Sequence, residues 1–173
     1  MKKLLIYIIN YNTEKFVKNT FQRINKKIFE NYETEILISD DSSTDKTLEE
    51  IKSIKETYAD KVKITILSNP KNLGYGGNQK IGYYYAIKNN FDYVALLHGD
   101  GQYAPELLND LVSSLEKENA QAVFGSRMIS KFGAIRGGMP IYKFVGNKIL
   151  SYLQNKLLNS NLSEFHSGYR VYE

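Results

Sequence analysis

Short apolar runs alternate along the chain with longer segments of helical periodicity. Five short runs are rich in apolar and β-branched residues, and they cover residues 4–9, 35–39, 62–67, 93–97 and 120–124. Such runs are typical of strands buried on both faces of a parallel sheet. Between them, apolar positions recur every three to four residues and predict helices over residues 16–28, 48–58 and 104–115. The pattern therefore predicts an α/β fold with a mostly parallel sheet flanked by helices on both faces.

Two of the predicted helices carry start signals. Ser42-Ser43-Thr44-Asp45 precedes the second helix, and residues of these types accept hydrogen bonds from the free N–H groups of a first turn. Pro105 stands near the first turn of the third helix, where its missing N–H costs nothing.

The regular alternation stops at Met128. Three glycines between residues 133 and 138 predict a flexible loop, and Pro140–Leu158 is a long amphipathic segment. The chain then ends directly after a strand-like segment, residues 169–172, so we expect the natural protein to be longer.

The length and composition of the chain are those of one globular domain. At 173 residues the chain can bury about two-thirds of the surface that it exposes when unfolded. It has no cysteine, which excludes a disulfide framework and a thiolate metal site.

The opening apolar run is short and is followed by Asn10-Tyr11-Asn12, which favours a buried strand over a signal peptide. No run approaches the roughly 20 apolar residues of a membrane span. We expect a cytoplasmic protein, with the inner face of the membrane as a further location.

Positive charge is concentrated in the last third of the chain. No acidic residue lies between Glu118 and Glu164, and this interval carries six basic residues: Arg127, Lys131, Arg136, Lys143, Lys148 and Lys156. The whole chain has a net charge of +4, so the remainder sums to −2 (4 − 6). This uneven distribution favours a local anionic partner, such as substrate phosphates or a lipid surface, over nucleic acid.

Polar residues collect where each predicted strand ends. The clusters are Asn10-Tyr11-Asn12, Asp40-Asp41-Ser42-Ser43, residues 69–74, His98-Gly99-Asp100 and Gly125-Ser126-Arg127. Each could serve only its own turn, and the second could simply cap the next helix. Ligands of parallel sheets bind beyond the carboxyl ends of the strands, however, so five clusters at one edge indicate a binding site.

Six motifs in order resemble those of the family 2 glycosyltransferases of the GT-A fold, especially the dolichyl- and polyprenyl-phosphate sugar transferases. They are Ile9-Asn10-Tyr11-Asn12, Asp40 to Thr47, Asn72-Leu73-Gly74 with Gly77, His98-Gly99-Asp100-Gly101-Gln102, Gly125-Ser126-Arg127 and His166-Ser167-Gly168-Tyr169-Arg170. The resemblance covers nearly the whole chain. It implies an enzyme that takes a UDP- or GDP-sugar with a divalent cation, Mg²⁺ or Mn²⁺. It also implies one catalytic domain over residues 1–173, with residues 1–127 binding the nucleotide sugar and residues 128–173 on the acceptor side.

The resemblance also assigns roles to particular residues. It places the nucleotide sugar against Ile9, Tyr11, Asn12, Asp41, Ser42, Gly74, His98, Gly99 and Asp100. Within this set, Tyr11 and Asp41 line the nucleobase pocket, and Asp41 accepts a base N–H. Asp100, assisted by Gln102, holds the metal against the donor diphosphate.

Two positions depart from the family pattern. Ile9 replaces a proline, and His98 replaces the first acid of the Asp-x-Asp motif. His98 could contact the ribose, bind Mn²⁺ through a ring nitrogen, or simply pack at the strand end. A loss of metal dependence is the alternative that this replacement leaves open.

The acceptor side contains the remaining catalytic candidates. Arg127 and Arg136 are candidates to clamp phosphate, with solvated surface arginines as the alternative. Inverting transfer to a sugar hydroxyl needs a base, and Glu164 is the one candidate, whereas an anionic polyprenyl phosphate needs none. We favour the polyprenyl phosphate narrowly over a saccharide hydroxyl of cell-surface polysaccharide synthesis. Residues 140–158 are then either a membrane-docking helix or a core-packing helix with a basic face.

Two other classes of protein remain as alternatives. A nucleotidyltransferase would carry a Gly-rich basic loop after the first strand, where this chain has Asn10-Tyr11-Asn12-Thr13-Glu14. A non-catalytic nucleotide-sugar-binding domain would fit His98 and the abrupt end of the chain.

Overall fold

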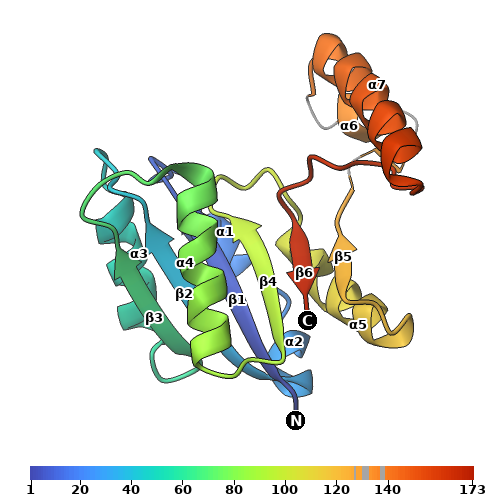
Figure 1. Cartoon of the computed structure of the whole chain (residues 1–173). Helices are drawn as coiled ribbons and strands as arrows, with labels where there is room; N and C mark the ends of the chain where they lie inside the picture. Colours follow the sequence, from blue (N-terminus) through green and yellow to red (C-terminus); the bar gives the residue numbers. More distant parts are fainter. Residues whose placement is uncertain (127, 130–132, 137–138) are drawn as a thin grey trace. The chain divides into compact units, whose positions relative to one another are not determined.

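The computed structural model describes residues 1–126, 128–129, 133–136 and 139–173 (Figure 1). The chain divides into two compact units, residues 1–123 with 169–173 and residues 124–168. The strands are β1 (Lys3–Asn10), β2 (Glu33–Asp40), β3 (Lys63–Ser68), β4 (Tyr93–His98), β5 (Ala122–Phe124) and β6 (Arg170–Tyr172). The helices are α1 (Val17–Gln22), α2 (Lys27–Asn31), α3 (Thr47–Tyr58), α4 (Gly74–Lys88), the 3₁₀ helix η1 (Pro105–Leu107), α5 (Leu108–Lys117), α6 (Gly133–Arg136) and α7 (Ile141–Leu158).

The six strands form one sheet in the order β3-β2-β1-β4-β6-β5. β1 pairs in parallel with both β2 and β4, and β2 pairs in parallel with β3. β6 pairs antiparallel with β4. The chain leaves β1 toward β2 and β3 and returns to the other side of β1 with β4. The carboxyl end of β1 is therefore the point where the strand order reverses, which is where open α/β sheets bind ligands.

Side chains of β1 alternate between two apolar layers, because successive residues of a strand point to opposite faces. Leu4, Ile6 and Ile8 pack with apolar residues of α1, α2, α3 and α5. Leu5, Tyr7 and Ile9 pack on the opposite face with Ala86, Tyr83 and Tyr85 of α4, which crosses that face in Figure 1. The predicted α/β architecture, a mostly parallel sheet with helices on both faces, is confirmed.

The structure differs from the predicted elements in three places. The helix predicted over residues 16–28 is two short helices, α1 and α2, because the backbone turns between them and Ile24 N–H donates to the Phe21 carbonyl at 3.2 Å. α4 was not predicted, since four glycines in its first nine residues hide its periodicity. Gly133, expected in a flexible loop, begins the short helix α6, while Gly137 and Gly138 lie outside the described residues.

The N-cap residue of α3 is Lys46, without a side-chain cap bond, and the predicted capping stretch contributes through Asp45, which bonds the first helical N–H. Asp45 Oδ1 accepts the backbone N–H of Thr47 at 3.0 Å and the Thr47 hydroxyl at 2.5 Å. Its Oδ2 accepts the N–H of Glu14 at 3.2 Å. Asp45 therefore bonds the first turn of α3 and also ties the loop after β1 to the loop after β2.

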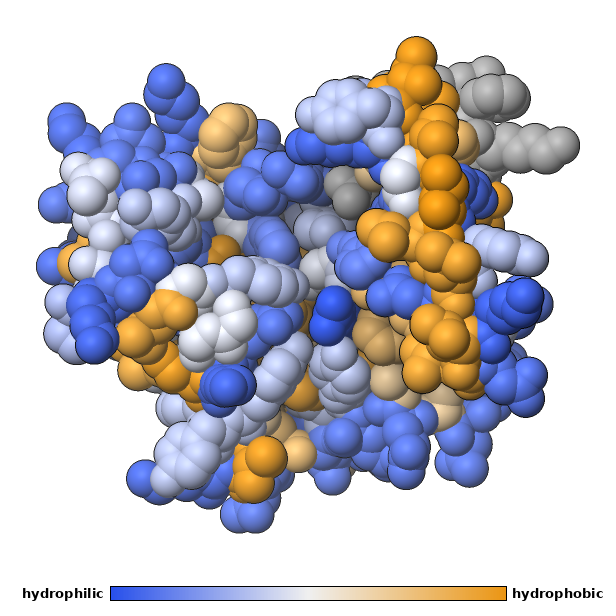
Figure 2. Space-filling view, turned by 45° about the horizontal axis from the view of Figure 1, so that its top comes forward, coloured by the Kyte–Doolittle hydropathy of each residue, from blue (hydrophilic) through white to orange (hydrophobic). Residues whose placement is uncertain are grey.

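Helix α7 belongs to the unit of residues 124–168 and exposes most of its apolar residues. Figure 2 shows its aliphatic side chains as a continuous orange ridge. Ile149 and Leu157 are 56% and 83% exposed, and Ser151 is the buried residue of this helix. The core-packing alternative for residues 140–158 is therefore wrong. None of the described helices is both long and apolar enough to cross a membrane.

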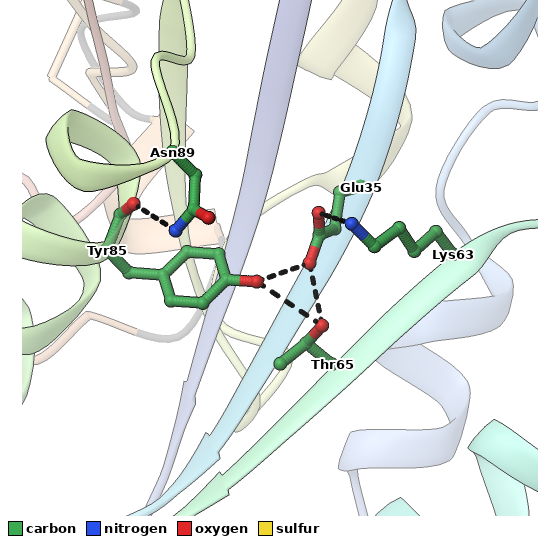
Figure 3. Close-up of polar contacts among 5 residues, drawn as sticks. All are labelled: Glu35, Lys63, Thr65, Tyr85 and Asn89. Atoms are coloured by element: carbon green, nitrogen blue, oxygen red, sulfur yellow. Dashed lines mark hydrogen bonds and ion pairs between the residues drawn. The ribbon is translucent and has the colours of Figure 1, made fainter.

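A polar cluster lies between β2, β3 and α4 around the buried carboxylate of Glu35 (Figure 3). Glu35 Oε1 accepts the hydroxyls of Thr65 and Tyr85, both at 2.6 Å, and Oε2 pairs with Lys63 Nζ at 2.9 Å. Burial alone raises the pKa of Glu35, but the bonds from Thr65, Tyr85 and Lys63 together hold that pKa below its ordinary value.

Replacing Glu35 with Gln should lower the free energy of unfolding at pH 7 by about 1 to 2 kcal/mol, because the charge-assisted bonds are lost. A carboxyl group whose pKa is lower in the folded than in the unfolded protein stabilises the fold at pH values above its unfolded pKa. This stabilisation is lost as the pH falls through the folded pKa. The difference between wild type and Glu35→Gln should thus be constant above about pH 5 and shrink at lower pH. Urea unfolding as a function of pH measures it, with exposed Glu33→Gln on the same strand as control. A difference that persists unchanged at low pH would contradict this account.

Candidate functional site

The carboxyl ends of β1, β2 and β4 and the start of α4 enclose a pocket of about 320 Å³. Its lining comprises Ile9, Asn10, Tyr11, Thr13, Asp41, Asn72, Gly74, Tyr75, Asn78, His98, Gly99 and Asp100. Every residue predicted to bind the nucleotide sugar lies in this lining except Asn12 and Ser42. The sheet order brings these residues together, because β1 stands between β2 and β4.

Asn10 and Gly99 form the base of the pocket. Asn10 Nδ2 donates to the carbonyls of Ile8 at 3.1 Å and Ser39 at 3.0 Å, and its Oδ1 accepts the Thr13 hydroxyl at 2.9 Å. A Cβ at position 99 would lie 1.7 Å from Asn10 Oδ1. Position 99 must therefore be glycine, since the backbone passes directly over the amide that joins β1 to β2.

Asp41 is buried at the side of the pocket, with 3% of its surface exposed. Its Oδ1 accepts Asn69 Nδ2 at 2.7 Å and the backbone N–H of Leu73 at 2.9 Å. These bonds hold the loop between β3 and α4 against the end of β2. Among the described residues, none donates to the second oxygen, Oδ2, so this atom is available to accept an N–H group from a ligand.

Asp100 lines the pocket from a tight turn that follows β4. Its Oδ1 accepts the backbone N–H of Gln102 at 3.1 Å, and Gly101 takes φ = 73°, which glycine adopts without strain. Gln102 therefore shapes the turn through its backbone, and its side chain is not in the pocket lining.

The residues around Asp100 suit a cation that a ligand also coordinates. Within the described part of the chain, no three His, Cys, Asp or Glu side chains gather to hold a metal ion. Mg²⁺ and Mn²⁺ accept carboxylate oxygens and complete their shells with substrate phosphates and water. One carboxylate beside a pocket fits a cation shared with a bound diphosphate and does not fit a permanent protein-held metal.

His98 is packed between two aromatic rings. Its ring centroid lies 5.0 Å from that of Tyr75 and 5.1 Å from that of Tyr103, and its Nε2 is 3.2 Å from the Tyr75 hydroxyl oxygen. Tyr103 in turn contacts Tyr169, at 5.8 Å between centroids. This packing orients the histidine at the end of β4 beside Asp100. A direct role of His98 in binding metal or ribose stays a prediction.

Asn12 and Ser42 lie in the loops that follow β1 and β2. Both take left-handed backbone conformations, with φ of 52° and 62°. Asn12 N–H donates to Ser43 Oγ at 2.9 Å, and Asn12 Oδ1 accepts the N–H of Thr44 at 2.9 Å. These bonds of Asn12 join the loop that follows β1 to the loop that follows β2.

Several pocket residues were not assigned a role in binding the nucleotide sugar, although two of them, Asn10 and Asn72, lie in polar clusters that predicted a binding site. The full set is Asn10, Thr13, Asn72, Tyr75 and Asn78. Tyr75 and Asn78 belong to α4, and without that helix nothing in the sequence places them near β1. The signal that could have revealed Asn78 is its position one helical turn after Gly74, on the face that meets the sheet.

The acceptor-side candidates belong to the unit of residues 124–168. Glu164 is 2% exposed, and its carboxylate accepts Asn147 Nδ2 at 3.0 Å and the Ser126 hydroxyl at 3.4 Å. Arg127 lies outside the described residues. Arg136 ends α6, and its side chain also lies outside the described part of the structure. The phosphate-clamping roles of these arginines therefore stay predictions.

Comparison with known proteins identifies the family. The model of glycosyl transferase family 2 matches residues 5–173. A UDP-N-acetylglucosamine–dolichyl-phosphate N-acetylglucosaminyltransferase of Methanococcus voltae is 28% identical over 183 residues, covering 99% of this chain and 70% of the relative. The low-salt glycan biosynthesis hexosyltransferase Agl6 of Haloferax volcanii is 31% identical over 140 residues, covering 80% of this chain and 30% of that protein.

A solved structure supports the fold. Glucosyl-3-phosphoglycerate synthase from Mycobacterium tuberculosis, in complex with Mn²⁺, UDP and phosphoglyceric acid, superposes with a TM-score of 0.62 at 18% identity. The match covers 99% of this chain and 56% of that one. The predicted GT-A fold is confirmed by this likeness and by the six-stranded sheet with helices on both faces. The predicted resemblance is confirmed as well, and the chain belongs to glycosyl transferase family 2.

Proposed function

We propose that this chain transfers a sugar, with inversion, from a nucleoside-diphosphate sugar to a polyprenyl-phosphate-type acceptor. The pocket at the end of β1 carries this proposal, because it combines a buried carboxylate, Asp41, with a partly exposed one, Asp100. Asp41 would accept an N–H of a nucleobase through Oδ2. Asp100, which lines the same pocket, would hold the diphosphate through a shared cation.

The donor side of the reaction follows from these positions. Tyr11 is 51% exposed at the pocket, so its ring offers a surface on which a base can stack. A divalent cation held by Asp100 would neutralise charge on the diphosphate leaving group. The Mycobacterium tuberculosis structure contains Mn²⁺ together with UDP, which supports a cation of this kind. Residues 1–127 would then bind the donor, and residues 128–173 would serve the acceptor.

The acceptor is assigned from charge and from the Methanococcus voltae relative. That relative is named as acting on dolichyl phosphate. In this chain, residues 119–163 carry six basic and no acidic residues, which suits an anionic acceptor. A phosphate oxygen would attack the anomeric carbon, the bond from that carbon to the diphosphate oxygen would break, and the nucleoside diphosphate would leave. No proton has to be removed from an ionised phosphate, so no base is needed.

Transfer to a saccharide hydroxyl is the second candidate function, because Glu164 could remove the proton. This carboxylate is buried and accepts hydrogen bonds from Asn147 and Ser126, which also suits a purely structural role. A third candidate, a non-catalytic nucleotide-sugar-binding domain, is favoured by the replacement of the first motif acid with His98.

Measuring nucleoside diphosphate release by wild type and Glu164→Gln separates the three candidates. UDP- and GDP-sugars with Mn²⁺ are offered together with either a polyprenyl phosphate or a saccharide. We expect release with the polyprenyl phosphate, changed less than about threefold by Glu164→Gln. A general base would instead contribute about a hundredfold or more, so a loss of that size with the polyprenyl phosphate would contradict the proposal. Exposed Glu118→Gln serves as control, and binding of donor without release by any acceptor would favour the binding domain.

A further inference from the structure

Helix α7 carries most of its apolar side chains on one exposed face, while exposed Leu150 and Leu158 and half-buried Phe144 lie outside that face. Six side chains of the exposed face, Ile141, Val145, Ile149, Tyr152, Leu153 and Leu157, are between 47% and 83% exposed. At 100° per residue they fall within an arc of about 160° on the helix surface. The aliphatic members form the ridge visible in Figure 2. An exposed apolar face of this length is unusual for a monomer in water and marks an interaction surface.

The opposite face of α7 is largely polar, apart from Phe144 and Leu158, and is fixed by hydrogen bonds. Asn147 Nδ2 donates to Glu164 Oε1 at 3.0 Å. Asn155 pairs with Leu162 twice, since its Nδ2 donates to the Leu162 carbonyl at 2.9 Å and its Oδ1 accepts the Leu162 N–H at 2.8 Å. Rotating the helix to bury the apolar face would break these bonds. In α7 the apolar face is exposed and the polar face turns inward, which is the reverse of the arrangement in a helix packed on a core.

The charges on α7 complement an anionic surface. Lys143 and Lys148 lie just beyond the two edges of the apolar arc, and Lys156 lies inside it. No acidic residue occurs between positions 119 and 163. A basic helix with a wide apolar face is the pattern of helices that lie in the interface of a lipid bilayer.

Lys156 also distinguishes a bilayer from a second copy of the chain. In a dimer formed through this face, the Lys156 ammonium group of each copy would be buried against a helix face that carries no acidic residue to pair with it, which is costly. At a bilayer surface, lysine can keep its aliphatic stem among the lipid tails and extend its ammonium group to the headgroups. The Tyr142 and Tyr152 side chains, both exposed, suit the same boundary between apolar tails and polar headgroups.

We propose that the apolar face of α7 docks in the plane of a bilayer rich in anionic lipid. The docking is a surface contact, since α7 is not apolar enough to span the bilayer. This inference goes beyond the proposed reaction and does not depend on it, because it would hold for any acceptor. It would also bring the unit containing Glu164 to the surface where polyprenyl lipids reside.

Tryptophan fluorescence tests the contact directly, because the chain contains no tryptophan. Tyr152→Trp places one on the apolar face of α7, and Tyr84→Trp places a control on α4. Both tyrosines are 66% exposed, so the two tryptophan probes replace side chains of equal solvent exposure. With vesicles of phosphatidylcholine and phosphatidylglycerol, emission of the α7 probe should move to shorter wavelength and be quenched by brominated acyl chains. The α4 probe should not change.

Two further variants test the contributions of charge and apolar area. Lys148→Gln should lower the vesicle partition coefficient about fivefold, since each basic residue near an anionic leaflet contributes about that factor. Ile149→Glu should lower it at least about tenfold, whereas Ile87→Glu, at an exposed site on α4, should not. Circular dichroism shows whether each variant is folded.

Three results would overturn the proposal. One is an α7 probe that does not respond to vesicles, and another is an equal response of the α7 and α4 probes. The third is a spectral shift without vesicles that follows self-association in sedimentation, because the face would then be occupied by a second copy. None of these readouts requires sugar transfer, so they remain valid if the proposed function fails.

Discussion

Replacing Asp100 with Asn should lower the rate of sugar transfer by about a hundred- to thousandfold while leaving the chain folded. The amide keeps an oxygen that can accept the Gln102 N–H, so the turn at Gly101 should persist. What it removes is the negative charge that Asp100 contributes to the pocket. Loss of one group that stabilises charge in a transition state has an effect of this size.

The metal dependence of nucleotide binding gives a second readout for Asp100. Calorimetric titration with UDP or GDP should show that Mn²⁺ tightens binding to wild type and has little effect on Asp100→Asn. Asp60→Asn, an exposed aspartate outside the pocket, should behave as wild type. If Mn²⁺ changed neither binding nor rate in wild type, the replacement of the first motif acid by His98 would have removed the metal dependence. Full activity of Asp100→Asn with Mn²⁺ present would refute the role of Asp100.

His98 shows where the sequence stops determining the site. Its position at the end of a strand could be predicted, because the preceding run is continuously apolar and the motif is local. Its surroundings could not, because Tyr75 comes from a helix that the apolar pattern does not reveal. The choice among metal binding, ribose contact and packing therefore could not be made from the chain alone.

The pocket itself was predictable for a topological reason. Once the runs at residues 4–9, 35–39 and 93–97 are taken as parallel strands, their polar ends must lie at one edge of the sheet. The sequence does not give the strand order, which determines that Asp41 and Asp100 lie on opposite sides of β1. It also does not show that Asn12 bonds to Ser43 and Thr44 in the loop after β2, since the left-handed conformation of Asn12 depends on both loops together.

Helix α7 illustrates a different limit. Its periodicity correctly predicts a helix, but periodicity alone does not say which face turns inward. The inward face is decided by partners that are distant or irregular, such as Glu164 and the carbonyl of Leu162. Reading an apolar stripe as buried is the usual inference, and here it fails because the polar stripe makes the specific bonds.

Replacing Gly82 with Ala should lower the free energy of unfolding by about 1 to 3 kcal/mol, the usual cost of overpacking a core. A Cβ at this position would lie 2.1 Å from two ring carbons of Tyr7. The ring is fully buried, and its hydroxyl oxygen lies 2.8 Å from both the carbonyl oxygen and Oδ1 of Asn78. The ring therefore cannot move without disturbing Asn78, which lines the pocket, so nucleotide binding should weaken as well.

Gly76→Ala in the same helix is the matched control for Gly82→Ala. A Cβ at position 76 meets nothing within 4 Å, so alanine there should raise the free energy of unfolding by about 0.5 to 1 kcal/mol. Urea unfolding of both variants measures the two opposite effects. Combining Gly82→Ala with Tyr7→Leu should cost less than the sum of the two single changes, because the smaller side chain removes the clash. Additive costs, or equal effects at positions 76 and 82, would show that contact with Tyr7 is not what requires glycine in α4.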